Sequence, residues 1–84
     1  MLAIVGGRGL SALDNLQVTH RQVIRTPYGL PSGALTFGIL NGKEVVFLAR
    51  HGYGHTLAPH EINYRANIWA LKEVGATRIA SVSA

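Results

Sequence analysis

The feature that most constrains the fold is an apolar run, Val45-Val46-Phe47-Leu48, that closely follows an Asn41-Gly42 pair. Asn-Gly between two β-rich segments is a strong hairpin signal, because both residues adopt the positive φ that a two-residue turn requires. The pattern predicts strands over residues 34–40 and 44–49. A strand of consecutive apolar residues is expected to be buried on both faces, so the hairpin should belong to a larger sheet.

Three more segments have strand-like patterns, at residues 2–5, 18–26 and 77–83. The first is a short apolar run that ends in two glycines, which predicts a buried strand at the centre of the sheet. Residues 10–16 can hold at most two turns of helix. Residues 26–33 are rich in proline and glycine, which predicts a loop.

One helix is predicted over residues 60–74, from apolar positions that share one helical face: Ile62, Ala66, Trp69 and Ala70. Glu61 is expected in its first turn, where a carboxylate favours the helix dipole, and Gly75 just after its end. Trp69 and Tyr64 are expected to be core or subunit-contact aromatics. A helix between two buried strands forms a βαβ-like unit, which predicts an α/β fold with a partly parallel sheet.

Composition sets the scale of the domain. The chain has 84 residues, of which 48% are hydrophobic and 14% charged, and it has no cysteine. So short a chain forms one small domain at most and buries a limited fraction of its surface. A sheet that ended at residue 83 would also leave an apolar face uncovered. The chain is therefore either unusually well packed or buries its apolar faces against another subunit or the rest of a longer protein, and we expect residues 1–84 to be a part of such a longer protein.

The net charge is +4, from eight basic and four acidic residues, and the basic residues are scattered singly. This arrangement disfavours a nucleic-acid-binding arm and is compatible with a site for a small anion. No apolar run approaches the roughly 20 residues that span a bilayer, and no signal-peptide pattern is visible. A cytoplasmic protein without membrane or nucleic-acid partners is the expectation.

Arg50-His51 is the first candidate site, because it lies where a predicted buried strand ends and a glycine-rich loop begins. Ligands bind at the carboxyl ends of strands in open α/β sheets. The guanidinium offers a rigid fork of donors for phosphate oxygens, and histidine adds a tunable donor. The alternative, an arginine paired with a carboxylate and a histidine in an ordinary loop, is about equally consistent with the residues. Ser83-Ala84, at the end of another strand, is a second candidate anion cradle or an ordinary strand end.

Two other patterns are weaker. Gly7-x-Gly9-x-x-Ala12 fits a loose dinucleotide fingerprint, but the acidic residue expected about 20 positions later is missing. A turn whose N–H groups face a single phosphate, or a plain tight turn, explains these glycines better. His51, His55 and His60 have spacings that suggest zinc, but no cysteine or aspartate nearby completes a site, and no metal is expected.

Five blocks in order resemble the methylthioadenosine/methylthioinosine phosphorylase branch of the purine nucleoside phosphorylase family. The blocks cover the whole chain: residues 6–10 (GGRGL), 26–32 (TPYGLPS), 48–52 (LARHG), 55–56 (HT) and 63–72 (NYRANIWALK). The resemblance implies an α/β nucleoside phosphorylase-like fold around a mixed sheet, usually trimeric, with sites near subunit boundaries. It implies reversible phosphorolysis of a purine nucleoside, 5'-methylthioadenosine or 5'-methylthioinosine, in which phosphate attacks the ribose C1′.

By the same resemblance, Arg50 and His51 match the family's phosphate-binding pair, and Ser83 and Ala84 match its Thr/Ser-Ala step. Arg8 stands where the family has a Thr or Ser whose hydroxyl touches phosphate, a departure that either adds a cation or crowds the site. No residue here is expected to act as a nucleophile, and no cofactor is implied besides phosphate as co-substrate.

Family members are considerably longer, and their purine-binding segments lie beyond the position of Ala84. The resemblance therefore assigns this chain the phosphate half of a site, and the 84 residues alone are expected to be inactive. The alternatives are a non-catalytic module that binds phosphate or assembles with another chain and, with less support, an NAD-binding domain.

Overall fold

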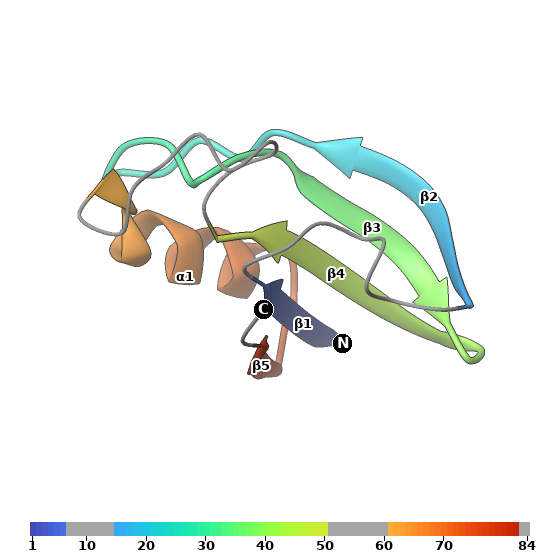
Figure 1. The fold of residues 1–84 in the computed structure, drawn as a ribbon. Helices are drawn as coiled ribbons and strands as arrows, with labels where there is room; N and C mark the ends of the chain where they lie inside the picture. Colours follow the sequence, from blue (N-terminus) through green and yellow to red (C-terminus); the bar gives the residue numbers. More distant parts are fainter. Residues whose placement is uncertain (7–14, 51–60, 83–84) are drawn as a thin grey trace.

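The computed structural model describes residues 1–6, 15–50 and 61–82. These residues form five strands and one helix: β1 (Leu2–Gly6), β2 (Leu16–Gln22), β3 (Leu35–Leu40), β4 (Lys43–Ala49), α1 (Tyr64–Glu73) and β5 (Arg78–Val82). The strands form one sheet in the order β2-β3-β4-β1-β5, along one side of which α1 lies (Figure 1).

The sheet is mixed, as expected. β1 pairs in parallel with both β4 and β5, whereas β3 is antiparallel to both β2 and β4. β1 therefore has a hydrogen-bonded partner on each side, which confirms its predicted central position. The chain leaves β4, forms α1 and returns to β5 on the far side of β1, so β4, α1 and β5 make the expected βαβ crossover.

The hairpin is the best-predicted part of the fold. Asn41 and Gly42 have φ values of 51° and 80°, the positive pair that a two-residue hairpin turn requires. β3 and β4 begin within one residue of the predicted positions. Residues 45–49 of β4 are all buried, so this strand is covered on both faces as predicted.

Two apolar clusters lie on opposite faces of the sheet. On the helix side, Ala70 and Leu71 of α1 pack in one cluster with Val46 and Leu48 of β4, together with Ala3, Val5 and Leu35. The other cluster is centred on Ile4, Phe47 and Ala49. Full burial of each large aliphatic side chain contributes about 1.5–3 kcal/mol, so alternate residues of β4 stabilise both layers.

The helix begins later than the sequence predicted. α1 starts at Tyr64, because the side chain of Asn63 caps it by accepting a hydrogen bond from the N–H of Ala66 at 3.1 Å. Glu61 therefore precedes the helix, and its expected place in the first turn is wrong. The predicted C-terminal signal is confirmed, since Gly75 follows the helix with a φ of 97°.

Two strand predictions need correction. β2 covers Leu16–Gln22 instead of residues 18–26, and Leu16, predicted to end a short helix, is the first residue of the strand. β5 was expected to be buried, yet residues 78–81 are exposed, because among the described residues β5 lies at the edge of the sheet and pairs with β1 alone. The burial of a strand depends on what lies beside it, which its own residues do not encode.

Gly38→Ala tests the packing of β2 on β3. A Cβ at Gly38 would lie 2.7 Å from the backbone oxygen of Gln17, a contact that is relieved only if the backbones of β2 and β3 move apart. We expect a loss of about 1–3 kcal/mol in unfolding free energy and faster hydrogen exchange at β2 amides.

The control is Gly75→Ala, where an added Cβ meets nothing within 4 Å and only the positive φ is strained. This variant should lose stability without raising exchange in β2. Unchanged β2 exchange in Gly38→Ala would contradict the prediction.

Candidate functional site

The carboxyl ends of three adjacent parallel strands meet at one edge of the sheet. Gly6 at the end of β1 is in register with Ala49 of β4 on one side and with Val82 of β5 on the other. The next residues in the sequence are Gly7, Arg50 and Ser83. The chain thus enters all of the predicted anion-binding segments from this edge, where open α/β sheets bind ligands.

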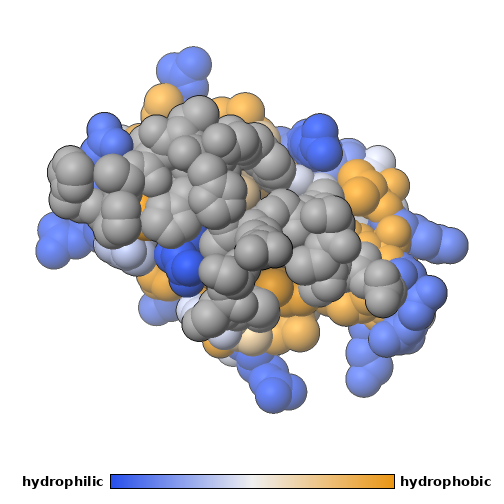
Figure 2. Space-filling view, viewed as in Figure 1, coloured by the Kyte–Doolittle hydropathy of each residue, from blue (hydrophilic) through white to orange (hydrophobic). Residues whose placement is uncertain are grey.

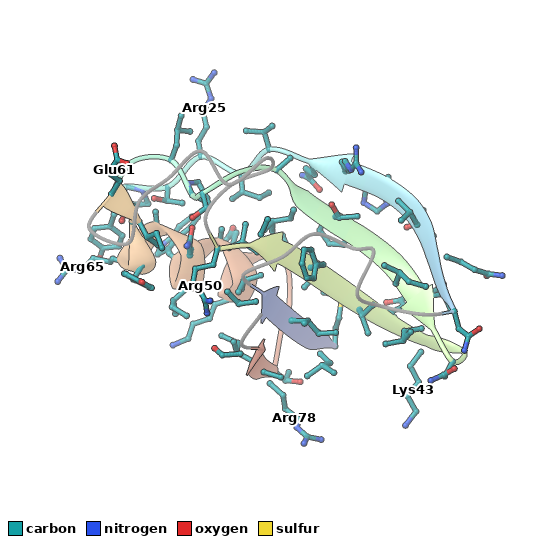
Figure 3. The ribbon with its side chains drawn as sticks, viewed as in Figure 1. Arg25, Lys43, Arg50, Glu61, Arg65 and Arg78 are labelled. Carbon is teal, nitrogen blue, oxygen red and sulfur yellow. The ribbon has the colours of Figure 1, made fainter. Side chains whose placement is uncertain are left out.

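Arg50 is the one predicted site residue that the structure describes. Its backbone is fixed at both polar groups: its N–H donates to the carbonyl of Gly6 at 2.8 Å, and its carbonyl accepts from the Ser32 hydroxyl at 2.6 Å. The residue is partly buried. In Figure 3 its side chain lies beside α1 and the ends of β1 and β4, whereas those of Arg25, Lys43 and Arg78 extend from the periphery.

Ser32 is in turn held by the helix. Its N–H donates to Oδ1 of Asn67 at 2.8 Å, and Nδ2 of Asn67 donates to the Ser32 hydroxyl oxygen at 3.0 Å. Asn67 is only 3% exposed, although it lies on the helical face that otherwise buries alanine and leucine. A buried amide must be hydrogen-bonded to avoid a penalty of about 1–3 kcal/mol, and Ser32 satisfies both ends of this one.

A second asparagine, one turn earlier, binds the same loop. Asn63 caps α1 with its oxygen and donates from Nδ2 to the carbonyl of Tyr28 at 2.7 Å. The loop is also closed internally, since the Thr26 hydroxyl donates to the Gly29 carbonyl at 2.6 Å. The guanidinium carbon of Arg65 lies 5.1 Å from the centroid of the Tyr28 ring, a favourable cation–π distance.

These contacts join elements that are far apart in the sequence. The loop that contains Tyr28 and Ser32 is tied to α1 at two points, and through Ser32 it reaches the end of β4. The sequence analysis did not identify Ser32, Asn63 or Asn67 as site residues. The available signal was the pair of asparagines four residues apart within the predicted helix over residues 60–74, because asparagine has a low helix propensity and favours caps.

The other predicted site residues, Arg8, His51, Ser83 and Ala84, lie outside the described residues, as do Gly7, Gly9 and Ala12 of the dinucleotide pattern and all three histidines of the zinc pattern. Within residues 1–6, 15–50 and 61–82, no group of three or more metal-ligating side chains is found. In this same part of the chain, no helix is long and apolar enough to cross a membrane.

Two grooves among the described residues do not include Arg50 in their lining. A groove of about 630 Å³ lies at the opposite edge, where β1 begins and the hairpin turns, and its lining includes Leu2, Leu40 and Val45. A shallower groove lies over α1 between Tyr28 and Trp69, and Tyr64 beside it is 54% exposed, so Tyr64 is not a core residue of this chain. Figure 2 shows hydrophilic residues mostly at the rim of the viewed face and hydrophobic ones toward its middle and right.

Comparison with known proteins gives a consistent result. A Pseudomonas syringae protein named probable S-methyl-5'-thioinosine phosphorylase is 54% identical over 82 residues, which are 98% of this chain and 33% of that protein. The S-methyl-5'-thioadenosine phosphorylase of Geobacter sulfurreducens is 49% identical over all 84 residues and 29% of its own length. The chain is a homologue of these phosphorylases. It spans about a third of their length, and no protein-family model matches it.

Solved phosphorylase structures share the fold. A methylthioadenosine phosphorylase from an antarctic soil metagenomic library superposes with a TM-score of 0.86 at 50% identity, over 95% of this chain and 28% of that one. The Schistosoma mansoni enzyme in complex with adenine gives a TM-score of 0.84 at 40% identity, over 95% and 27%. The α/β nucleoside phosphorylase-like fold inferred from the five sequence blocks is thereby confirmed over the 95% of the chain that superposes.

Asn63→Ala tests the tie between α1 and the loop. It removes the helix cap and the bond to the Tyr28 carbonyl together, so we expect a loss of about 1–2 kcal/mol in unfolding free energy by chemical denaturation. Asn63→Ser retains a capping hydroxyl but cannot reach Tyr28, and it should lose about half as much. Parent-like stability in Asn63→Ser would contradict a contribution from the bond to Tyr28, and equal losses in the two variants would contradict a contribution from the cap.

Proposed function

We propose that residues 1–84 are the N-terminal part of a single phosphorylase domain and supply the phosphate half of its active site. The reaction is phosphorolysis of 5'-methylthioadenosine or 5'-methylthioinosine. Phosphate attacks C1′ of the ribose, and the purine leaves as methylthioribose 1-phosphate forms. The names of the relatives support this substrate class.

The observation that carries the proposal is the placement of Arg50. It follows β4 at the edge where β1 and β5 also end, and both of its backbone polar groups are hydrogen-bonded. A side chain that leaves a fixed backbone loses less freedom when it binds a ligand. The guanidinium then presents parallel donors that match two oxygens of a phosphate.

The reaction requires the protein mainly to position phosphate and to stabilise charge in the transition state. Phosphate is itself the nucleophile, so no side chain needs to form a bond to the sugar. The site holds the dianion in line with C1′ and stabilises the charge of an oxocarbenium-like transition state. Together with Arg50, the residues proposed to hold phosphate are His51, Ser83, Ala84 and, as a cation in place of a hydroxyl, Arg8.

The proposal includes an incomplete site. The purine half would come from the C-terminal two thirds of such a domain, and the functional assembly would be a homo-oligomer, a trimer by family resemblance. No cofactor is proposed besides phosphate, and we propose a cytoplasmic role in purine salvage for the complete enzyme. The isolated 84-residue chain is then inactive.

A hybrid enzyme tests the function. Residues 1–84 replace the matching third of the Pseudomonas syringae relative, and phosphorolysis is measured with methylthioadenosine, methylthioinosine and inosine. We expect turnover that saturates with phosphate, and a fall in kcat/KM on the order of 100-fold in Arg50→Gln, because a charged donor to the anion is lost. Arg25→Gln, which removes the same charge from an exposed site, should leave kcat/KM within about twofold of the parent.

Other outcomes separate the alternatives. A folded hybrid without turnover, in which the chain still binds phosphate, would favour a non-catalytic phosphate-binding module. A rise in melting temperature with NAD but not with phosphate would favour a dinucleotide site. Clear turnover by the isolated chain would contradict the proposed incompleteness.

A further inference from the structure

We infer that Asn67 is a positioning residue for phosphate, acting through Ser32 on the backbone of Arg50. The inference rests on the proposed function, because it assumes that Arg50 binds phosphate. It adds two residues that do not themselves touch the anion. The observation behind the inference is a series of hydrogen bonds that connects α1, through Ser32, to the end of β4.

Asn67 determines which atoms donate and which accept in this series of hydrogen bonds. Nδ2 is a donor only, so the hydroxyl oxygen of Ser32 must accept from it. The hydroxyl proton is then free to point away from Asn67, toward the Arg50 carbonyl 2.6 Å from the oxygen. Hydrogen bonds that share a hydroxyl in this way polarise and strengthen one another.

The same amide fixes the position of Ser32 as well as its proton. Oδ1 of Asn67 accepts from the Ser32 N–H, so the residue is held at both its backbone and its side chain. Asn67 lies in α1 beside Ala66, Ala70 and Leu71, which are all fully buried. Packing therefore fixes the helix, and the amide transmits that fixed position to the loop.

The consequence for Arg50 is geometric. Its N–H is held by Gly6 and its carbonyl by Ser32, so both peptide planes that flank its Cα are constrained. Side-chain rotamers depend on these backbone angles, and the long arginine side chain amplifies small backbone rotations at its tip. Loss of the hydrogen bond from Ser32 would leave the orientation of the Arg50 guanidinium toward phosphate less well defined, although the guanidinium group itself would be unchanged.

Asn63 provides an internal comparison. It lies one turn before Asn67 and ties the same loop to the same helix, but through the carbonyl of Tyr28. The hydrogen bonds of the described residues connect it to the helix cap and the loop, and not to Arg50. A purely structural role for Asn67 predicts that both asparagines matter alike, whereas a positioning role predicts that only Asn67 affects phosphate.

The experiment titrates the ¹⁵N-labelled hybrid enzyme, which contains residues 1–84, with inorganic phosphate and follows the Arg50 side-chain resonance. Melting curves establish for each variant that the titration is done below its unfolding transition. We expect Ser32→Ala and Asn67→Ala to raise the phosphate Kd about fivefold, the equivalent of one ordinary hydrogen bond. Ser32→Thr retains the hydroxyl and should restore the parent Kd within about twofold, and Asn63→Ala should match the parent although it melts earlier.

Each outcome is decisive. If the parent hybrid binds phosphate and Ser32→Ala binds it equally well, the positioning role is overturned while the phosphate site stands. If Asn63→Ala weakens phosphate binding as much as Ser32→Ala, general loosening of the loop explains the effect and the inference is again overturned. If the parent hybrid does not bind phosphate, the proposed function loses its phosphate site as well. If Asn67→Ala does not fold, the positioning role is tested by comparing the phosphate Kd of Ser32→Ala, which lacks the hydroxyl, with that of Ser32→Thr, which retains it.

Discussion

Parallel pairing of β1 with strands on both of its sides is the constraint on which the rest of the structure depends. Parallel strands need a crossover connection, so the segment between β4 and β5 must travel over the sheet, and α1 does so. The same pairing aligns the carboxyl ends of three strands. The strand order alone therefore creates an edge of the sheet at which open α/β folds bind ligands, whatever side chains are present there.

Helix α1 has two roles. Its apolar positions cover the sheet, whereas Asn67, on the same buried face, and the N-cap residue Asn63 bind the loop that follows β2. Because loops lack a regular hydrogen-bonding pattern, their backbone groups need side-chain partners when they are buried. Asn63 and Asn67 supply such partners, and so a loop without regular secondary structure is fixed against the end of β4.

Short sequence patterns correctly predicted the hairpin turn and the C-terminal end of the helix, whose geometry depends on only a few neighbouring residues. The Asn41-Gly42 turn and the glycine after α1 were predicted because positive φ favours particular residues. The helix start was misplaced by four residues, since Ile62 fits the apolar period but precedes the Asn63 cap. The exposure of β5 was missed for another reason: an edge position is a property of the sheet and not of the strand.

By itself, the sequence determined a mixed α/β fold, a strand buried on both faces and an arginine at a strand end, because hydrophobic pattern and turn chemistry act over a few residues. Its five blocks also predicted the resemblance to the phosphorylases that the comparisons found. Only the tertiary structure decided which groups hold that arginine. Ser32 lies 18 residues before Arg50 and 35 before Asn67, and hydrogen bonds between such distant residues exist only once the sheet, the crossover and the loop have come together.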